Sequence, residues 1–367
     1  MALKIAPVSR PALCVINYNG ARHLRDSLPR VAGLRHQFGD VVLVDDASTD
    51  DSVAVMKRLV PRAQIVRLTE NGGPGAARNA GLRATRATRV LFMDNDVLPG
   101  MELAPTLCAA LDAAPAAVMA VPRVVSLEDP DRIEYEGGDA HVSGLMTLRT
   151  AGALASSAPA AGDVAAIGTL ITCCFLLDRA RWGQEDLFDE RLRIYFEDHE
   201  LGLRARMRGL DLLAVPAAVC QHGDGTPGLS IRATGRHTPE RVRNTILNRW
   251  QVILKLYERR TLMLMAPYLA LFELYQLTGC MVLGWGGHWW QAARELLRRS
   301  ADIRMRRRAF QATRVRGDTL VLSAGPHPFN PALARRAPVR LLQATLDVAA
   351  SLNWALVRRL GRREVGS

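Results

Sequence analysis

The stretch LFMDNDV, residues 91–97, is a short apolar run that ends in two carboxylates. Its first three residues predict the end of a buried strand, and Asp94 and Asp96 follow with Asn95 between them. Burying a carboxylate costs free energy unless it is paired or holds a metal. Two carboxylates at this spacing can reach one hard cation, Mg²⁺ or Mn²⁺. The alternative is a tight Asp/Asn turn whose side chains cap backbone amides.

The same pattern of an apolar run followed by polar turn residues occurs twice earlier in the chain. PALCVINYNG (11–20) and VVLVDDASTD (41–50) both show it, and helical signals follow over residues 21–37 and 51–60. NGGPGAARNAG (71–81) then predicts a Gly-rich turn that enters a helix. This alternation predicts an α/β fold with a mostly parallel sheet flanked by helices. Ligands of such sheets bind outside the carboxyl ends of the strands, so we expect the polar turns to converge on one crevice.

Composition and charge limit the classes of protein that need to be considered. The chain has 367 residues, of which 49% are hydrophobic and 23% charged, so it is long enough for more than one domain and is not disordered throughout. The six cysteines show no metal or disulfide spacing, which favours buried thiols. The first residues contain no signal-peptide pattern, so we expect the catalytic part in the cytosol. We expect a catalytic domain over residues 1–236 and a helical, basic region over residues 237–367.

Further polar residues stand at positions where they add to a site. Asp45 and Asp46 end the second apolar run, and either carboxylate suits a ribose hydroxyl, a base N–H or the cap of the next helix. The Gly-rich turn offers backbone amides, and Arg78 suits a phosphate or a base edge. The turn is not a dinucleotide fingerprint, because Arg78 stands where the third Gly belongs. His222, after a later apolar run, is either a third metal ligand or a structural histidine.

The pair Glu197-Asp198 opens a predicted helix, FEDHELGLRARMRGL, residues 196–210. Acidic residues favour helix N-termini for purely structural reasons, through capping and the helix dipole. The functional interpretation is a general base that takes a proton from an acceptor hydroxyl.

These motifs together resemble a known family. INYNG, VVLVDDASTDDS, NGGPGAARNAG, LFMDNDV, LFDERLRIYFEDHELGLRARMRG and His222 occur in this order in inverting family 2 glycosyltransferases, which have the GT-A fold. The resemblance covers residues 10 to 245, and RVRNTILNRW (241–250) is similar to the helix that follows the catalytic domain in many members. It implies metal-dependent transfer of a sugar from a nucleoside-diphosphate sugar to an acceptor hydroxyl, with inversion.

The resemblance also implies roles for individual residues. Asp198 is expected to be the catalytic base, with Glu197 supporting it. Asp94 and Asp96 form the DxD motif, Asp96 being the closer ligand of Mg²⁺ or Mn²⁺, and His222 completes the metal site. Asp45 is expected at the nucleotide base, and the nucleotide-sugar site comprises Asn17, Asn19, Asp45, Asp46, Gly72, Arg78, Asp94 and Asn95.

Two departures from the family pattern narrow the expectation. We find no QxxRW motif of the processive synthases after Asp198, which favours the addition of one or a few sugars. The usual Gly-Gly before FDE is replaced by a stretch that begins at Gly183, so the acceptor side is expected to differ. A base-reading carboxylate suits a pyrimidine imide N–H, which favours a UDP- or dTDP-sugar, a hexose or deoxyhexose donor. The acceptor expected from the resemblance is an envelope glycan or a lipid-linked one.

The C-terminal region combines apolar and basic stretches. Residues 261–290 contain one charged residue, Glu273, and residues 294–316 contain nine arginines within a net charge of +12 for the chain. Pro267 and several glycines make residues 261–290 a poor single span, so we expect a re-entrant or interfacial helix pair. The arginines would then face anionic lipid at the cytoplasmic face of the cell membrane, as in a peripheral, re-entrant or monotopic protein. The alternative is a buried helical hairpin of a soluble domain.

Three other functions are weighed against this one. A nucleotidyltransferase also uses metal carboxylates, but NYNGAR stands where its Gly-rich loop is expected. A non-catalytic membrane-bound protein on a degenerate transferase fold is a second alternative. Such a protein is expected to have lost its carboxylates, whereas Asp45, Asp94, Asp96 and Asp198 are all present. Charge alone suggests nucleic acid, but the tryptophans beside the arginines favour lipid, so we expect no nucleic-acid partner.

Overall fold

A computed structural model describes residues 10–158, 163–184, 186–225, 237–328 and 337–361. The three apolar runs identified above form strands that lie side by side in the order β4–β1–β2, and almost all of their residues are buried. The first half of the chain comprises β1 (Ala12–Asn17), α1 (Ala21–Gly33), β2 (Val41–Asp45), α2 (Ser52–Leu59), β3 (Gln64–Arg67), α3 (Pro74–Ala84), β4 (Arg89–Asp94), β5 (Val97–Pro99), α4 (Leu103–Ala113), β6 (Ala117–Ser126), β7 (Ile133–Tyr135), β8 (Gly138–His141) and β9 (Met146–Leu148).

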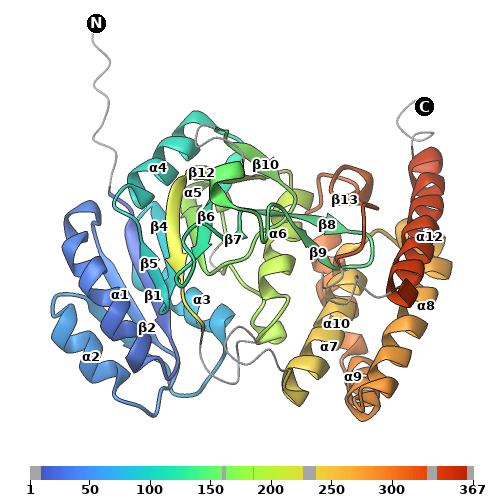
Figure 1. Cartoon of the computed structure of the whole chain (residues 1–367), viewed down its shortest axis with the longest axis horizontal. Helices are drawn as coiled ribbons and strands as arrows, with labels where there is room; N and C mark the ends of the chain where they lie inside the picture. The colour runs from blue at the N-terminus through green and yellow to red at the C-terminus, as the bar shows by residue number, and fades with distance from the viewer. Residues whose placement is uncertain (1–9, 159–162, 185, 226–236, 329–336, 362–367) are drawn as a thin grey trace, which may run out of the picture.

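The second half adds three strands to the large sheet and then a group of helices (Figure 1). It comprises β10 (Ala165–Ile167), β11 (Cys174–Asp178), α5 (Arg179–Trp182), α6 (Glu197–Met207), β12 (Asp211–His222), α7 (Pro239–Leu256), α8 (Arg259–Val282), α9 (Gly286–Arg298), α10 (Ser300–Gln311), β13 (Leu322–Ser323) and α12 (Ala337–Gly361). Short 3-10 turns over Arg35–Gln37, Ala155–Ser157, Glu190–Leu192 and Asp318–Leu320 complete the described elements.

The large sheet is parallel at one side and mixed at the other. Its strand order is β10-β12-β6-β11-β4-β1-β2-β3. From β4 to β3 every pairing is parallel, as predicted, whereas β11 runs antiparallel to both β4 and β6. The parallel half brings the ends of β1, β2 and β4 to one edge, so the polar turns that follow these strands share one end of the sheet.

Close packing of α3 on the sheet depends on a glycine. A Cβ at Gly81 would lie 2.1 Å from Sγ of Cys14 on β1, so no larger residue fits there without a shift. This contact holds the helix that carries Arg78 against the strands that carry the acidic turns. All six cysteines are buried and none forms a disulfide, as expected from their spacing.

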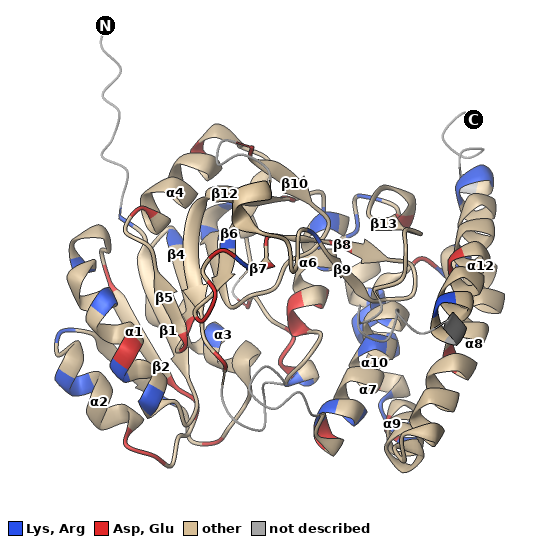
Figure 2. Ribbon diagram, viewed as in Figure 1, with Lys and Arg blue, Asp and Glu red and all other residues tan. Residues whose placement is uncertain are grey.

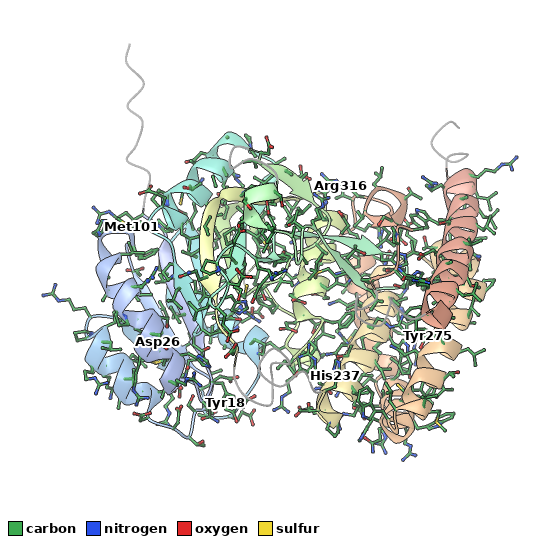
Figure 3. The ribbon with its side chains drawn as sticks, in the orientation of Figure 1. Tyr18, Asp26, Met101, His237, Tyr275 and Arg316 are labelled. Carbon is green, nitrogen blue, oxygen red and sulfur yellow. The ribbon has the colours of Figure 1, made fainter. Side chains whose placement is uncertain are left out.

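The C-terminal helices pack behind α6, the helix that begins with Glu197 and Asp198. Side chains fill the space between them (Figure 3), and one apolar cluster joins Leu203 and Met207 of α6 to α7, α8 and α12. β13 pairs with β8, so the C-terminal region also contributes a strand that the sequence did not indicate. The predicted boundary at residue 236 falls between β12 and α7, in a segment outside the described residues, and it stays a prediction.

Residues 261–290 form most of α8 and the start of α9, neither fully buried nor fully exposed. Tyr268 and Phe272 pack inward, and the side chain of Glu273 pairs with Arg249, which is itself buried. Met263 and Leu274 point outward and are 69% and 62% exposed. Within the described part of the chain, no helix combines the length and the apolar character needed to cross a membrane.

The nine arginines between residues 294 and 316 do not form one solvent-facing block. Arg306 and Arg314 are at most 9% exposed at their side chains and pair with Asp189 and Asp318. Arg304 and Arg308 on α10 are exposed, as are Arg294 and Arg298 on α9. Figure 2 shows the basic residues over α7 and α10. Only part of the block is therefore available to an anionic surface.

Candidate active site

Three predicted metal ligands lie together at the end of the sheet. Asp94 ends β4, Asp96 follows it, and His222 ends β12, which pairs with β5 so that His222 stands opposite Val97. One ligand atom from each of Asp94, Asp96 and His222 lies within 4.8 Å of the other two. Nε2 of His222 is 3.4 Å from Oδ2 of Asp96. Strand pairing therefore brings together residues that are 126 positions apart in the sequence.

Glu134 supports this group from behind, and the sequence did not indicate it. Its carboxylate oxygen lies 3.2 Å from Nδ1 of His222, on the ring nitrogen opposite the one that faces Asp96. Metal-binding histidines commonly hold a carboxylate on their second nitrogen, which fixes the ring and raises its basicity. Two carboxylates, one imidazole and this outer carboxylate fit a divalent cation such as Mg²⁺ or Mn²⁺. No motif marks Glu134, because only the pairing of β7 with β6 places it near β12.

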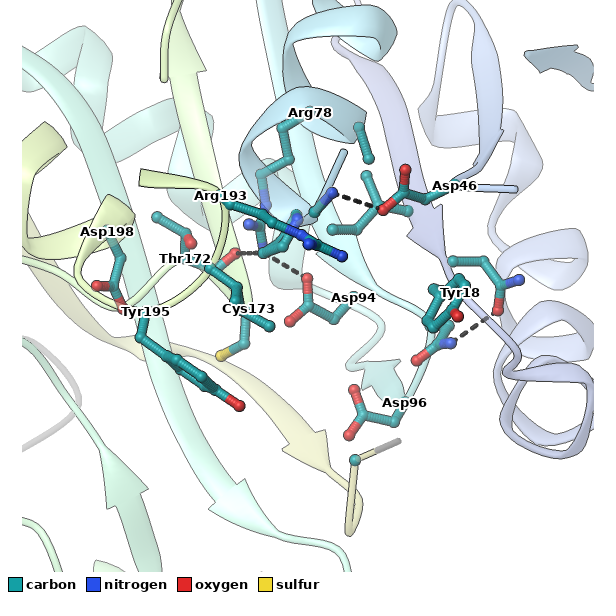
Figure 4. Close-up of a pocket in the computed structure, with 18 of the residues that line it drawn as sticks. Tyr18, Asp46, Arg78, Asp94, Asp96, Thr172, Cys173, Arg193, Tyr195 and Asp198 are labelled. Atoms are coloured by element: carbon teal, nitrogen blue, oxygen red, sulfur yellow. Dashed lines mark hydrogen bonds and ion pairs between the residues drawn. The ribbon is translucent and has the colours of Figure 1, made fainter. Parts of the chain in front are cut away.

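Arg78 lies at the floor of the same region rather than at a solvent edge. Its Nη2 donates to Oδ1 of Asp94 at 2.5 Å and to the carbonyl oxygen of Thr172 at 2.9 Å. The side chain is 2% exposed, and Nε and Nη1 make no hydrogen bond among the described residues. Two buried guanidinium nitrogens without partners can donate hydrogen bonds to an anionic ligand at low desolvation cost. Figure 4 shows Arg78 reaching toward Asp94 from α3.

The turn residues near β1 and β2 are fixed by their own hydrogen bonds. Nδ2 of Asn17 donates to Asp45 at 3.3 Å, and Oδ1 of Asn17 accepts from Asn95 at 2.7 Å. Asp45 is fully buried and accepts from the backbone of Ser48, so its carboxylate lies behind Asn17 and does not line the pocket. Asn19 has a left-handed backbone with φ 47° and caps the turn at Thr49 rather than facing the pocket.

Asp46, not Asp45, is the carboxylate of this pair that reaches the pocket wall. It accepts hydrogen bonds from the backbone N–H groups of Gly72 at 2.8 Å and Gly73 at 2.9 Å. Burial raises the pKa of Asp46, and the two glycine amides oppose that rise. At Gly73, φ is 87° and a Cβ would lie 2.2 Å from the carbonyl oxygen of Arg193. The Gly-rich turn is thus held between Asp46 and the segment that precedes α6.

The acidic pair at the start of α6 lies across the pocket from Asp46. Burial raises the pKa of both Glu197 and Asp198, and the charge of Asp198 raises that of Glu197 further, while Arg78 opposes both shifts. Asp198 accepts the backbone N–H of His199 at 2.6 Å, and Oε2 of Glu197 has no hydrogen-bond partner in the described parts of the chain. A buried carboxyl with a raised pKa beside a ligand cavity is suited to proton transfer.

These groups surround one cavity of about 420 Å³. The predicted residues that line it are Asn17, Asp46, Arg78, Asp94, Asn95, Asp96, Asp198 and His222, whereas Asn19, Asp45, Gly72 and Glu197 do not line it. Sequence reasoning missed several further lining residues, namely Tyr18, Asn71, Thr172, Arg193, Tyr195, Glu240 and Arg241. Tyr18 stood within a quoted motif, and Arg241 begins the quoted RVRNTILNRW, so position in a motif was the available signal.

Comparison with known proteins relates the first part of the chain to one family. The family model described as Glycosyl transferase family 2 matches residues 12–161. A protein assigned to teichuronic acid biosynthesis, the glycosyltransferase TuaG of Bacillus subtilis, is 32% identical over 92 residues, 24% of this chain and 36% of that protein. The succinoglycan biosynthesis protein ExoO of Rhizobium meliloti is 35% identical over 83 residues, 22% of this chain and 24% of its own. The similarity therefore spans about a third or less of these relatives.

Two solved structures have a similar fold. A structure of GalNAc-T7 with UDP, GalNAc and Mn²⁺ matches 74% of this chain and 52% of that chain, with a TM-score of 0.57 and 16% identity. Staphylococcus aureus TarS 1–349 in complex with UDP-GlcNAc matches 97% of this chain and 92% of that chain, with a TM-score of 0.50 and 16% identity. The α/β sheet with flanking helices, followed by a helical C-terminal region, is the GT-A arrangement expected from the sequence.

Proposed function

Because residues 12–161 are a glycosyl transferase family 2 domain on a GT-A fold, we propose that this protein transfers a sugar from a nucleoside-diphosphate sugar to an acceptor hydroxyl with inversion. One observation carries the proposal: the Asp94, Asp96 and His222 group opens into the same cavity as Asp198. A donor held at the first three residues would present its sugar toward Asp198. Asp198, as the general base, and the departing nucleoside diphosphate then lie on opposite sides of the anomeric carbon, which inversion requires.

The donor side of the cavity is proposed to hold the nucleotide. The nucleobase lies against Tyr18 and Asn17, which line the cavity. Asp45 does not line the cavity, but it accepts a hydrogen bond from the Asn17 amide and so fixes that side chain. Mg²⁺ or Mn²⁺, held by Asp94, Asp96 and His222, would supply charge stabilisation for the departing diphosphate. Arg78 adds a second positive group there, through Nε and Nη1, which have no hydrogen-bond partner among the described residues. UDP- or dTDP-sugars are the proposed donors, in keeping with the UDP and UDP-GlcNAc of the two similar structures.

The acceptor side is proposed to lie at the start of α6. Asp198 takes the proton of the acceptor hydroxyl as the oxygen attacks the anomeric carbon and the carbon–oxygen bond to the diphosphate breaks. Glu197 is proposed to hold Asp198 and its charge in place from behind the wall. Glu197 is buried, whereas Asp198 is half-buried and lines the cavity, so an acceptor hydroxyl can reach Asp198.

The acceptor is proposed to be an envelope glycan or its lipid-linked precursor. The support is that two relatives are named for teichuronic acid and succinoglycan biosynthesis. The exposed apolar residues of α8 and the exposed arginines of α9 support a position on an anionic membrane surface, at its cytoplasmic face. In this proposal the protein lies on the membrane rather than in it.

Calorimetric titration of the purified protein with UDP, dTDP, GDP and ADP, in Mn²⁺ and then in EDTA, tests the donor site. One pyrimidine diphosphate should bind with Mn²⁺ and lose its binding in EDTA and in Asp96→Ala. Asp198→Asn should still bind that diphosphate and should lose transfer to any acceptor. Asp26→Asn is the matched control, because Asp26 is an exposed residue of α1 away from the cavity (Figure 3).

Other results would point elsewhere. Use of a nucleoside triphosphate with release of pyrophosphate would indicate a nucleotidyltransferase instead. If no diphosphate binds with any metal, the proposal loses its donor site. Sugar transfer that persists in Asp198→Asn would remove the base assignment.

A further inference from the structure

A second cavity, of about 340 Å³, lies between α7 and α9 and outside the site described above. Four arginines line it, Arg243 on α7 and Arg294, Arg298 and Arg299 at the end of α9. We refer to these four residues and the cavity between them as the arginine pocket. Apart from Leu247, the other lining residues are also polar, so the chemistry of the pocket suits a small anion better than an apolar ligand.

The charge of the arginine pocket is not balanced from within. Glu295 is its one carboxylate, and this residue is used by Arg299 at 2.7 Å and Arg298 at 3.7 Å. The hydrogen bond from Arg299 lowers the pKa of Glu295, so its carboxylate is ionised and already paired with that arginine. Among the described residues no carboxylate forms an ion pair with Arg243 or Arg294. Four guanidinium groups therefore share one carboxylate, and the remaining excess of positive charge favours binding of an anion in the pocket.

Exposed apolar side chains continue the same helix face toward the turn between α8 and α9. Trp290, Arg294 and Leu297 follow one another at helical spacing on α9, and Trp290 and Leu297 are 56% and 73% exposed. A Cβ on Gly286, one turn before Trp290, would lie 2.3 Å from the sulfur of Met281. Met281, Val282 and Leu283, at the end of α8, are 60%, 81% and 60% exposed. We call Met281, Val282, Leu283, Trp290 and Leu297 the apolar edge.

We propose that the arginine pocket binds the phosphate group of an anionic lipid while the apolar edge lies among the lipid head groups. Basic residues next to exposed tryptophan and aliphatic side chains match a surface that is anionic outside and apolar beneath. Nucleic acid would match the arginines but would leave the apolar edge without a partner. The inference rests on the proposed function for its biological role, since the acceptor is there proposed to be membrane-borne.

The position of the pocket ties lipid binding to the active site. Arg299 donates to the backbone carbonyl of Arg191 at 3.1 Å, in the segment that leads to α6. The first turn of α7 lines the sugar-transfer cavity with Arg241, and the next residues of the helix line the arginine pocket. The two cavities therefore share α7 as a wall, and a lipid phosphate bound here would hold the membrane close to the acceptor side of the first cavity.

Vesicle flotation with the full chain tests this inference. The probes are vesicles of phosphatidylcholine alone and of phosphatidylcholine with phosphatidylglycerol. The pocket variant is Arg294→Ala/Arg298→Ala, and the matched control is Arg304→Ala/Arg308→Ala, which removes two exposed arginines of α10 outside the pocket. At about 1 kcal/mol per arginine near an anionic surface, the pocket variant should bind phosphatidylglycerol vesicles about 30-fold more weakly. The control should bind within threefold of the unmodified protein.

The apolar edge has its own pair of variants. Trp290→Ser should weaken vesicle binding at least threefold, whereas Met101→Ser should not, because Met101 is 75% exposed but lies at the far side of the molecule (Figure 3). Equal losses in the two arginine variants would overturn the pocket in favour of diffuse charge. Binding of inorganic phosphate that needs Arg294 and Arg298, with no binding to phosphatidylglycerol vesicles, would overturn the lipid assignment, and so would RNA binding that needs the same two arginines.

A readout of nucleotide binding separates this inference from the proposed function. The pocket variant should bind the pyrimidine diphosphate with Mn²⁺ as tightly as the unmodified protein does. If the pocket variant loses vesicle binding but keeps nucleotide binding, the loss is due to the arginine pocket. If the unmodified protein binds no nucleotide, the proposed function is contradicted, but the vesicle result still supports the lipid site.

Discussion

The side-chain amide nitrogen of Asn248, on α7, lies 2.8 Å from the backbone carbonyl oxygen of Tyr195 in the segment that enters α6. The same nitrogen lies 2.7 Å and 3.0 Å from the carbonyls of Leu192 and Ile194. Tyr195 and the next residue, Phe196, have left-handed backbones, with φ of 67° and 70°. Such conformations cost about 1 kcal/mol or more for a residue other than glycine, so this segment needs external support.

Replacing Asn248 should therefore impair transfer more than donor binding. In Asn248→Ala the segment that precedes Asp198 loses its shared donor, and we expect kcat to fall about 10- to 100-fold because the base is less well placed. The measurement is kcat and KM for transfer together with calorimetric binding of the nucleotide diphosphate. The control is Asn353→Ala, whose amide bonds only within α12. An unchanged kcat in Asn248→Ala would contradict the positioning role.

Glu134 should matter for metal affinity without being a metal ligand. In Glu134→Gln the imidazole of His222 keeps a neighbour at Nδ1 but loses its carboxylate, and outer carboxylates of this kind contribute about 10- to 100-fold in affinity. Mn²⁺ titration followed by electron paramagnetic resonance measures the change. Glu128→Gln, an exposed residue nearby in the sequence, should leave the affinity unchanged. Equal affinity in both variants would argue against this arrangement of ligands.

The acidic pair at the start of α6 predicts how kcat/KM falls as the pH is lowered. A base must be deprotonated, so activity should be lost as the pH falls through the raised pKa of Asp198, which lies at about 6 and sets the window of the acid limb. We expect kcat/KM to rise across that window instead of near pH 4, where an ordinary carboxyl titrates. Glu197→Gln leaves Asp198 in place, so the acid limb should persist in that variant. A profile that is flat down to pH 5 would contradict the assignment.

The same pair should lower the stability of the fold at alkaline pH. A carboxyl with a folded-state pKa above its unfolded value binds more protons when folded, so its contribution to the free energy of unfolding falls as pH rises through that interval. For Glu197 the interval runs from its ordinary 4.5 to about 8. Glu197→Gln removes that charge, and at pH 8 it should increase the free energy of unfolding by about 1–2 kcal/mol. Chemical denaturation at pH 5 and pH 8 measures it, with exposed Glu102→Gln as the control.

A buried lysine should stabilise the fold by pairing with Glu200 on α6 and with Asp189. Nζ of Lys255 lies 2.6 Å from Asp189 and 2.8 Å from Glu200, and all three side chains are at most 9% exposed. Burial alone would raise the pKa of Asp189, but Lys255 and Arg306 hold it below its ordinary value. Lys255→Met leaves two buried carboxylates short of a partner and should lower the free energy of unfolding by about 3 kcal/mol. Lys57→Met, on the exposed face of α2, should change it by less than about 0.5 kcal/mol.

Local pattern was enough to predict the elements that carry the site. The buried runs before Asn17, Asp45 and Asp94 form adjacent strands, and the Gly-rich turn enters α3 as predicted. Motif order predicted eight of the side chains that line the cavity, but it also predicted Asn19, Asp45, Gly72 and Glu197, which do not line it. Both properties depend on residues close in sequence, whose hydrophobic period and turn chemistry fix the backbone.

The sequence by itself therefore determined the β-α alternation, the acidic turn at residues 94–96 and the acidic start of α6. Only the tertiary structure decided that Asp46 reaches the cavity while Asp45 lies behind Asn17, and that Glu134 stands behind His222. It also decided which arginines are buried ion-pair partners and which are open to an anion. The physical reason is that partners far apart in the chain meet through strand pairing and helix packing, which no local period encodes.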